Sequence, residues 1–248
     1  MPAPPRSSRP WRLPAAAAVA VLSGAALGAV APATPIFSAG ENGYHTYRIP
    51  ALLATAGGTV LAFCEGRVHG GGDSGDIDLL VRRSRDGGAA WDPQRVVWSD
   101  GANTCGNPCP VQDRETGAVW LLMTWNRGTD TERGIIDGAS ADTRRVFVAS
   151  SRDEGATWEP PREITAAVKR PDWTWYATGP CTGIQLRRGK FAGRLLIPCD
   201  HIEAGTKKYY SHVIYSDDRG ASWRLGGRTP SDQVNECQAV ELPDGRIM

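Results

Sequence analysis

An eight-residue pattern, Ser-x-Asp-x-Gly-x-x-Trp, occurs three times in this chain of 248 residues. The copies begin at Ser84, Ser151 and Ser216, and are therefore almost evenly spaced along the chain. A long pattern that recurs at a fixed period indicates supersecondary units that stack on one another. Each copy directly follows a run of strand-forming residues, at 79–81, 146–148 and 212–215. We therefore place the three copies on tight turns that leave strands.

The residue types in the pattern suit such a turn. An Asp side chain accepts hydrogen bonds from the backbone N–H groups that follow it, Gly adopts a positive φ without strain, and Trp anchors the turn by packing. The stretch of chain from one copy to the next has the length of a four-stranded propeller blade with a long loop. The pattern resembles the Asp box, or BNR repeat, of sialidases and related β-propellers. In that family the boxes lie away from the active site, so we interpret them as scaffold.

Composition supports an all-β fold. The chain contains 29 Gly and 18 Pro, and after residue 33 short β-like runs alternate with turn residues, with one helical turn expected near 164–169. The resemblance implies a six-bladed propeller of the sialidase type, which needs roughly 300 residues. Residues 34–248 are expected to form one domain with about three to four blades. The chain ends inside an expected strand, so we expect an N-terminal portion of a longer catalytic domain.

The N-terminus has the pattern of an export signal. Three arginines, Arg6, Arg9 and Arg12, precede an Ala-rich apolar stretch at 13–31. We predict a signal peptide at 1–33, with cleavage after Gly28 or after Ala33. The alternative is an uncleaved membrane anchor, since the stretch is close to the minimum length for a span. Either reading makes the protein secreted or exposed at the cell surface.

The net charge and the cysteine positions limit which kinds of partner and metal site the chain could have. The chain has 28 Lys and Arg against 27 Asp and Glu, a formal net charge of +1, which argues against nucleic acid as a partner. The six Cys and four His lack the spacing of a zinc site, so no metal is expected. A hairpin centred near residue 190 would set Cys181 opposite Cys199 as neighbours. A disulfide and two reduced thiols are both compatible with that placement.

Residues ahead of the first box carry a more specific resemblance. The segment Tyr47-Arg48-Ile49-Pro50 precedes a strand, which leads to Glu65-Gly66-Arg67 and a Gly-rich loop at 68–73. This order is similar to the start of the sialidase catalytic domain, and the resemblance extends over about residues 40–248. Guanidinium binds a carboxylate, such as that of sialic acid, through two parallel hydrogen bonds. The resemblance implies that Arg48 is the first of three arginines with this task, the alternative being an exposed surface arginine.

The acid/base residue is expected in the Gly-rich loop. Asp73 follows Arg48 at the sequence separation where sialidases place an aspartate that protonates the leaving group. Asp76 and Asp78 are alternatives, although they lead directly into the strand at 79–81. No organic cofactor is implied, because acid/base and nucleophilic groups suffice for this chemistry.

Three further residues are expected to touch or support the sugar. Glu65 and Arg67 have the same parity on a strand, so their side chains share a face. By resemblance, Arg67 meets the 4-hydroxyl region and Glu65 orients the arginines through a salt bridge, while the alternative is a surface ion pair. Asn107 lies in a rigid loop, Gly-Asn-Pro, and is expected at the N-acetyl or glycerol side. For the Trp and Tyr residues at 173–176, packing in the core is the preferred interpretation.

Glu236 is expected to be the base that activates the nucleophile. Its segment, Asn-Glu-Cys-Gln, looks like the one that bears this glutamate in sialidases, whose nucleophile is a tyrosine. Glu241 is the alternative. The resemblance places the tyrosine and two more arginines beyond residue 248, so we expect the chain printed here to be inactive by itself. We do not assign the nucleophile's role to Tyr209 or Tyr210.

Together these residues predict an exo-α-sialidase that removes terminal sialic acid with retention. Its partners would be sialylated glycoproteins, glycolipids and oligosaccharides, with no other protein required. The alternative is a non-catalytic Asp-box propeller that binds a glycan or a protein. The joint presence of Arg48, Asp73 and Glu236 favours the enzyme, since a binding module has no need of all three.

Overall fold

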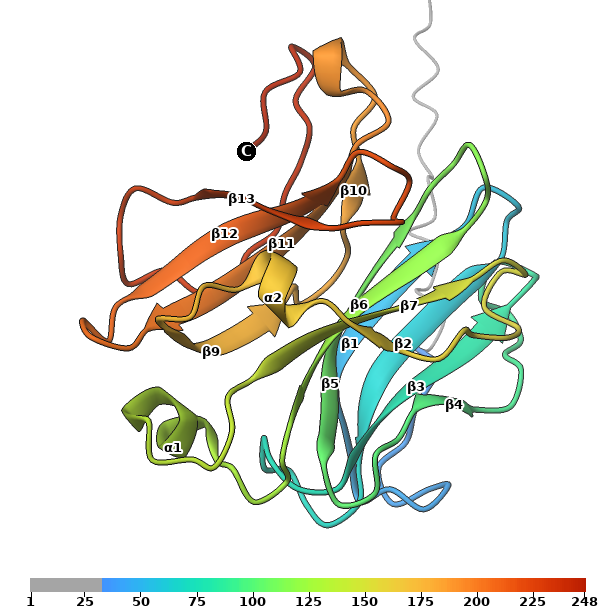
Figure 1. Ribbon diagram of the computed structural model, residues 1–248. Coiled ribbons are helices and arrows are strands. Elements are labelled where there is room, and N and C mark those ends of the chain that lie inside the picture. Colours follow the sequence, from blue (N-terminus) through green and yellow to red (C-terminus); the bar gives the residue numbers. More distant parts are fainter. Residues whose placement is uncertain (1–32) are drawn as a thin grey trace, which may run out of the picture. The chain divides into compact units, whose positions relative to one another are not determined.

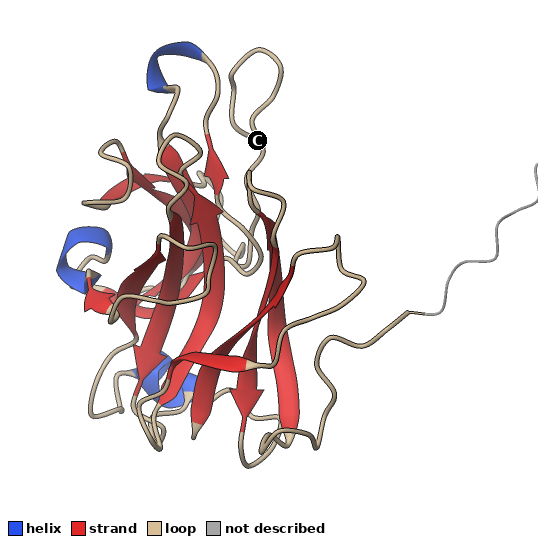
Figure 2. Ribbon diagram, turned by 90° about the vertical axis from the view of Figure 1, so that its right-hand side faces the viewer, coloured by secondary structure: helices blue, strands red, loops and turns tan. Residues whose placement is uncertain are grey.

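The computed structural model describes residues 33–248. Nearly all of the predicted signal peptide, 1–33, therefore lies outside the described residues. Within them strands predominate, and the helices are the short α1 (Glu132–Asp137), α2 (Thr165–Val168) and a 3-10 turn at Gly189–Phe191 (Figure 2). None of the described helices is both long enough and apolar enough to cross a membrane. The all-β prediction is confirmed.

The strands form two hydrogen-bonded sheets, of eight and five strands (Figure 1). The larger sheet consists of two antiparallel blades joined by one parallel pairing, Ile77 with Thr104, and the smaller sheet is a third blade. Blade 1 contains β1 (Thr46–Ala54), β2 (Val60–Arg67), β3 (Ile77–Ser84) and β4 (Arg95–Trp98). Blade 2 contains β5 (Thr104–Gln112), β6 (Val119–Asn126), β7 (Arg145–Ser151) and β8 (Arg162–Glu163). Blade 3 contains β9 (Trp173–Thr178), β10 (Ile184–Gln185), β11 (Leu195–Glu203), β12 (Tyr209–Ser216) and β13 (Arg224–Arg228). In blade 3 the first strand is divided, because β9 and β10 both pair with β11.

Each Asp box forms a turn that leaves a strand, as predicted, and in each blade this turn joins the third and fourth strands. In blade 2 the Ser151 hydroxyl donates to Asp153 at 2.8 Å and accepts from the N–H of Gly155 at 2.8 Å. The same Asp153 oxygen accepts the N–H of Thr157 at 2.8 Å. Equivalent bonds of 2.7 to 2.9 Å recur in the other two boxes. The repeat is therefore a recurring hydrogen-bonded turn as well as a recurring sequence.

The box glycines also set how closely the blades approach. Gly155 of blade 2 lies against Leu61 of β2, and Gly220 of blade 3 lies against Trp120 of β6. Each of these boxes thus contacts the second strand of the preceding blade. A methyl group on Gly220 would lie 2.1 Å from the Trp120 ring, which no real contact permits. The boxes therefore contribute to packing between blades in addition to closing a turn.

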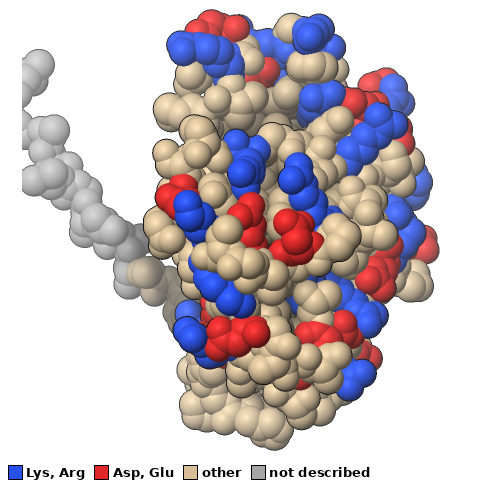
Figure 3. Space-filling view, turned by 60° about the vertical axis from the view of Figure 1, so that its left-hand side comes forward, with Lys and Arg blue, Asp and Glu red and all other residues tan. Residues whose placement is uncertain are grey.

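The core consists of apolar side chains between neighbouring blades. One cluster joins blades 1 and 2 around Phe63 and Leu121, and a second joins blades 2 and 3 around Leu122 and Ile197. On the face that Figure 3 shows, basic and acidic side chains are interspersed. Some charged residues are nevertheless buried, among them Glu65, Arg67 and Arg144.

The structure contradicts the predicted placement of Cys181 opposite Cys199. The hairpin register is as expected, with Ile184 opposite Leu196. However, β10 does not continue toward residue 181, and Cys199 pairs instead with Thr178 of β9. The prediction that Cys181 faces Cys199 is therefore wrong. All six cysteines are free thiols, with Cys181 exposed and Cys199 buried, and burial raises the pKa of the Cys199 thiol well above its usual value.

Two local expectations also differ from the structure. Helix α1 has no counterpart among the expected elements, because so short a helix does not show an amphipathic period. Its ends are nevertheless marked in the sequence, by Thr131, whose side chain accepts the N–H of Gly134 at 3.1 Å, and by Gly138 with φ of 72°. The strand expected at 239–242 is reduced to a single bridge between Glu241 and Ile247. The helical turn expected near 164–169 is present as α2.

Substitution of box glycines separates the two roles of the box. Gly88→Ala and Gly220→Ala both place a Cβ at positive φ, 97° and 94°, which costs about 1–2 kcal/mol. At Gly88 the nearest atom is 3.8 Å away, in its own Trp91, whereas at Gly220 the methyl group meets Trp120. We expect Gly220→Ala to lower the free energy of unfolding by about 1–3 kcal/mol more than Gly88→Ala does. Equal losses in urea titrations would contradict a role in blade packing.

Candidate active site

One cavity of about 160 Å³ lies where blade 1 meets blades 2 and 3. All six side chains that were selected from the sequence line it, namely Arg48, Glu65, Arg67, Asp73, Asn107 and Glu236. They come from β1, β2, the loop after β2, β5 and the segment after β13. The structure therefore brings these residues to one place, while their chemical roles stay predictions.

The first strands of blades 1 and 2 are irregular at the cavity. In β1 a bulge separates Arg48 from Ala51, and in β5 a similar bulge begins after Gly106. Within these bulges Ile49 and Asn107 have φ of 55° and 52°, and each precedes a proline. Positive φ is a rare state for a β-branched residue, and strained backbone of this kind clusters at functional sites. The bulges end the regular pairing at the level of the cavity.

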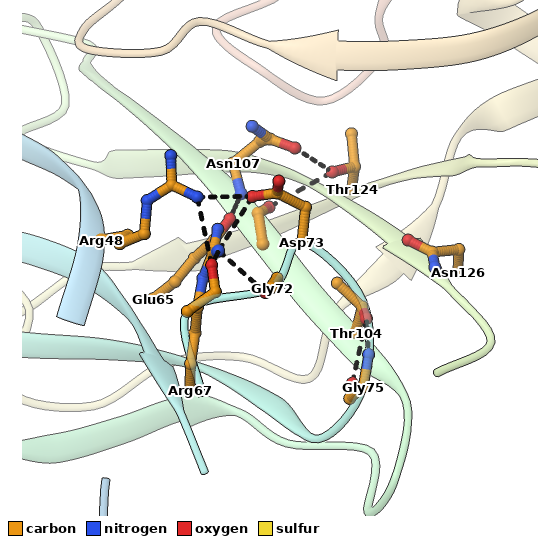
Figure 4. Close-up of polar contacts among 12 residues, drawn as sticks. Arg48, Glu65, Arg67, Gly72, Asp73, Gly75, Thr104, Asn107, Thr124 and Asn126 are labelled. Atoms are coloured by element: carbon orange, nitrogen blue, oxygen red, sulfur yellow. Dashed lines mark hydrogen bonds and ion pairs between the residues drawn. The ribbon is translucent and has the colours of Figure 1, made fainter. Parts of the chain in front are cut away.

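Asp73 is held between two guanidinium groups (Figure 4). One of its carboxylate oxygens lies 2.7 Å from Nη1 of Arg48 and 2.8 Å from Nη1 of Arg67. The Gly-rich loop folds around Arg67, whose Nη1 also donates to the carbonyls of Gly71 at 2.6 Å and Gly72 at 2.8 Å. The Asp73 side chain is 54% exposed. It is thus fixed at the cavity while remaining accessible to a ligand.

The alternatives to Asp73 lie elsewhere. Asp78 is buried and accepts a hydrogen bond from the Tyr44 hydroxyl at 2.7 Å. Neither Asp76 nor Asp78 is among the residues that line the cavity. Asp73 is therefore the member of this acidic segment that is placed for chemistry.

Glu65 and Arg67 form a buried ion pair, not a surface one. Both side chains are 3% exposed, and Oε2 of Glu65 accepts from Nε and Nη2 of Arg67 at 3.0 and 2.6 Å. The second oxygen, Oε1, accepts the backbone N–H of Asn107 at 2.9 Å. A Cβ on Gly106 would lie 2.3 Å from that oxygen, so glycine is required beside it. The pair supports Arg67 and links blade 1 to blade 2.

Arg48 retains donors for a ligand. Its contacts with Asp73 and with the Gly71 carbonyl at 3.4 Å both use Nη1. Among the described residues, Nε and Nη2 have no hydrogen-bond partner, and the side chain is 45% exposed. The edge formed by Nε and Nη2 presents two parallel N–H groups, the geometry that binds a carboxylate through two bonds.

The two candidate glutamates are separated by the structure. Glu236 lines the cavity, in a segment that is tied to β12 by a hydrogen bond of 2.5 Å from the Ser211 hydroxyl to the Asn235 carbonyl. Glu241 instead accepts the backbone N–H groups at 187 and 188, at 2.8 and 2.9 Å, and lines a different pocket. The position of Glu236 suits a cavity role, and that of Glu241 does not.

Blade 3 contributes four lining residues that were not predicted from the sequence, namely Trp175, Ala177, Asp200 and Tyr209. The interpretation of Trp175 as a core residue is therefore wrong, whereas Trp173 and Tyr176 are buried as expected. Asp200 is only 3% exposed, and no described residue donates a hydrogen bond to its carboxylate. Burial, with a smaller contribution from Glu236, raises its pKa to about 7. The sequence signal that could have identified Asp200 is a charged residue inside an otherwise buried strand, β11.

Arg144 in blade 2 was also missed, and the remaining polar residues of the lining are Glu132, Tyr209 and Asn235. Arg144 is 3% exposed, and burial lowers its pKa to about 10. The lining therefore combines a free guanidinium edge at Arg48 with the carboxylates of Asp73, Glu132, Asp200 and Glu236. No group of three or more His, Cys, Asp or Glu suited to a metal occurs within residues 33–248.

Comparison with known proteins matches this chain to one family. Residues 58–248 match the family model described as BNR repeat-like domain. The chain is 37% identical over 173 residues to the exo-alpha-sialidase of Aspergillus fumigatus, covering 63% of this chain and 41% of that protein. It is 37% identical over 217 residues to the sialidase of Micromonospora viridifaciens, covering 84% of this chain and 33% of that protein. The chain thus spans less than half the length of these two relatives.

Solved structures show the same fold. The Hadza microbial sialidase Hz136 superposes with a TM-score of 0.73 at 28% identity, over 81% of this chain and 41% of that one. The leech intramolecular trans-sialidase has a TM-score of 0.71 at 19% identity, over 89% of this chain and 49% of that one. The likeness to the leech enzyme concerns the fold alone. Both support a propeller of the sialidase type.

Asp200 provides a test of the cavity's electrostatics. Its raised pKa means that the folded state holds a proton that the unfolded chain, with an ordinary pKa near 3.8, releases. This costs stability increasingly between about pH 4 and pH 7, and fully above that. Asp200→Asn should therefore raise the free energy of unfolding by about 2–4 kcal/mol at pH 8 and leave it unchanged near pH 4. Urea titrations at both pH values measure this difference. An equal effect of the substitution at both pH values would contradict the raised pKa of Asp200.

Proposed function

Since the chain belongs to the family of BNR repeat-like domains, we propose that its cavity binds a terminal sialic acid and that the protein is an exo-α-sialidase. The proposal covers the activity and the substrates, namely sialylated glycoproteins, glycolipids and oligosaccharides. It is supported by the names of the relatives, which include an exo-alpha-sialidase and sialidases. Export to the cell exterior belongs to the same proposal and rests on the residues at 1–33. N-terminal sequencing of the secreted protein would test it.

The observation that carries this proposal is the pairing of Arg48 with Asp73. The two side chains are 2.7 Å apart, and Arg48 still has a free donor edge next to the acid. A ligand whose carboxylate is bound by that edge has its anomeric carbon, which bears the carboxylate, close to Asp73. The aspartic acid can then protonate the glycosidic oxygen as the bond breaks, and its carboxylate can later take a proton from water.

Other residues of the cavity fit the same reaction. Arg67 holds Asp73 in place from the buried side, and Glu65 compensates the charge of Arg67. Glu236 is proposed to activate the nucleophile, which by resemblance is a tyrosine and gives retention of configuration. Carboxylates at Asp200 and Glu236 repel the ligand's carboxylate, which favours its binding at the free edge of Arg48.

Binding tests the proposal independently of turnover. We expect 2,3-didehydro-2-deoxy-N-acetylneuraminic acid to bind at least tenfold more tightly than its methyl ester, because the ester lacks the carboxylate. Arg48→Lys should abolish most of that difference, since an ammonium cannot make two parallel bonds. Arg187→Lys, in a different pocket, is the matched control and should preserve it. Equal affinities for acid and ester in calorimetric titrations would overturn the proposal.

Turnover separates the enzyme from a binding module. Release of 4-methylumbelliferone from its α-sialoside should require Asp73, and Asp73→Asn should lower kcat while sparing binding of the acid. Binding without release, in a chain that carries every residue needed for chemistry, would favour a non-catalytic propeller.

A further inference from the structure

The two ends of the Asn107 side chain have different surroundings (Figure 4). Its Oδ1 accepts a hydrogen bond from the Thr124 hydroxyl at 2.8 Å and another from Nη2 of Arg144. Its Nδ2 has no hydrogen-bond partner among residues 33–248, although the residue is only 7% exposed and lines the cavity. The amide NH₂ is thus an unused donor at the cavity wall.

Arg144 determines which end of the amide faces the cavity. A guanidinium group only donates hydrogen bonds, so an acceptor must face it. If the amide were flipped, the NH₂ group would meet the guanidinium donor to donor, and both would be left unpaired. Thr124 reinforces the choice, because its oxygen accepts from Nε of Arg144 at 3.2 Å and its proton is then free for Asn107.

Arg144 is itself fixed, by neutral groups only. Its Nη1 donates to Oδ1 of Asn126 at 2.5 Å, and its guanidinium lies 4.2 Å from the centre of the Trp175 ring. It is 3% exposed, and burial lowers its pKa, while the charges of nearby carboxylates, the largest contribution coming from Glu65, oppose that change. Its hydrogen bonds to Asn126, Thr124 and Asn107 therefore hold a buried cation in one orientation.

The backbone of Asn107 is held in place by hydrogen bonds, so the side-chain amide is the part of the residue that can still rotate. Its N–H donates to Glu65 at 2.9 Å, and its carbonyl accepts from the Thr178 hydroxyl at 2.6 Å. These contacts, from blades 1 and 3, hold the residue at φ of 52°. Rotation of the side-chain amide is then the main motion that could alter what the cavity wall presents.

We propose that Arg144 is a positioning residue, which holds the Asn107 amide so that its NH₂ group faces the cavity and selects an acceptor oxygen on the ligand. The ligand's identity rests on the proposed function, but the orientation of the amide does not. The cavity then has an anion site at Arg48 and a second, donor site at Asn107. A ligand must match both.

The amide orientation can be tested in the ligand-free protein. In ¹⁵N spectra with asparagine labelled, the Asn107 NH₂ protons should exchange rapidly with solvent in the wild type. Arg144→Met removes the donors, so the amide can turn its NH₂ toward Thr124, and we expect shifted signals and slower exchange. Arg145→Met changes the neighbouring arginine, which instead pairs with Asp142, and is the matched control. Unchanged Asn107 signals in a folded Arg144→Met would overturn the proposal.

A double-mutant cycle distinguishes positioning from general support. We expect Arg144→Met and Asn107→Ala each to weaken binding of the didehydro sialic acid about tenfold, the equivalent of one hydrogen bond. The double variant should be no weaker than Asn107→Ala alone, and Arg144→Lys should restore part of the affinity. Additive losses would show that Arg144 acts independently of Asn107 and would refute its positioning role. If the wild type fails to bind, the proposed function fails, and the ligand-free spectra still decide this inference.

Discussion

The buried Glu65 carboxylate is the contact on which the arrangement of the cavity depends. It accepts three hydrogen bonds, two from Arg67 and one from the backbone of Asn107. A buried charge is stable only when it is paired and fully bonded, and loss of one partner strands the other. Through Arg67 it positions the loop that bears Asp73, and through Asn107 it reaches blade 2. The acid, its supporting arginine and the second blade therefore form one polar network.

This network depends on how the blades pack around it. Box glycines let blades 2 and 3 pack closely on their predecessors, and bulges in β1 and β5 end regular pairing at the cavity. Strain at Ile49 and Asn107 is sustained by the surrounding contacts. A single displaced blade would separate Glu65 from Asn107. Packing between blades and geometry of the cavity are thus linked.

The cavity lining mixes both signs of charge, and one of its acidic groups costs stability. Arg48, Arg67 and Arg144 line the cavity together with Asp73, Asp200 and Glu236. Asp200 is buried without a hydrogen-bond donor among the described residues, and its pKa is raised to about 7 in consequence. Unpaired polar groups of this kind destabilise a fold unless a ligand satisfies them.

By itself the sequence determined the elements that depend on local patterns. The Asp boxes predicted their turns, because a turn depends on residues that are close in sequence. The site residues were predicted through their resemblance to sialidase motifs, which included Asn107 on β5 and Glu236 after β13. Only the tertiary structure showed Arg144 and Asp200 in the same cavity, and it placed Cys199 opposite Thr178. These contacts join blades or divided strands, and side-chain alternation along one strand does not reveal which neighbour covers each face. The physical reason is that blade packing, a long-range interaction, decides what each strand face meets.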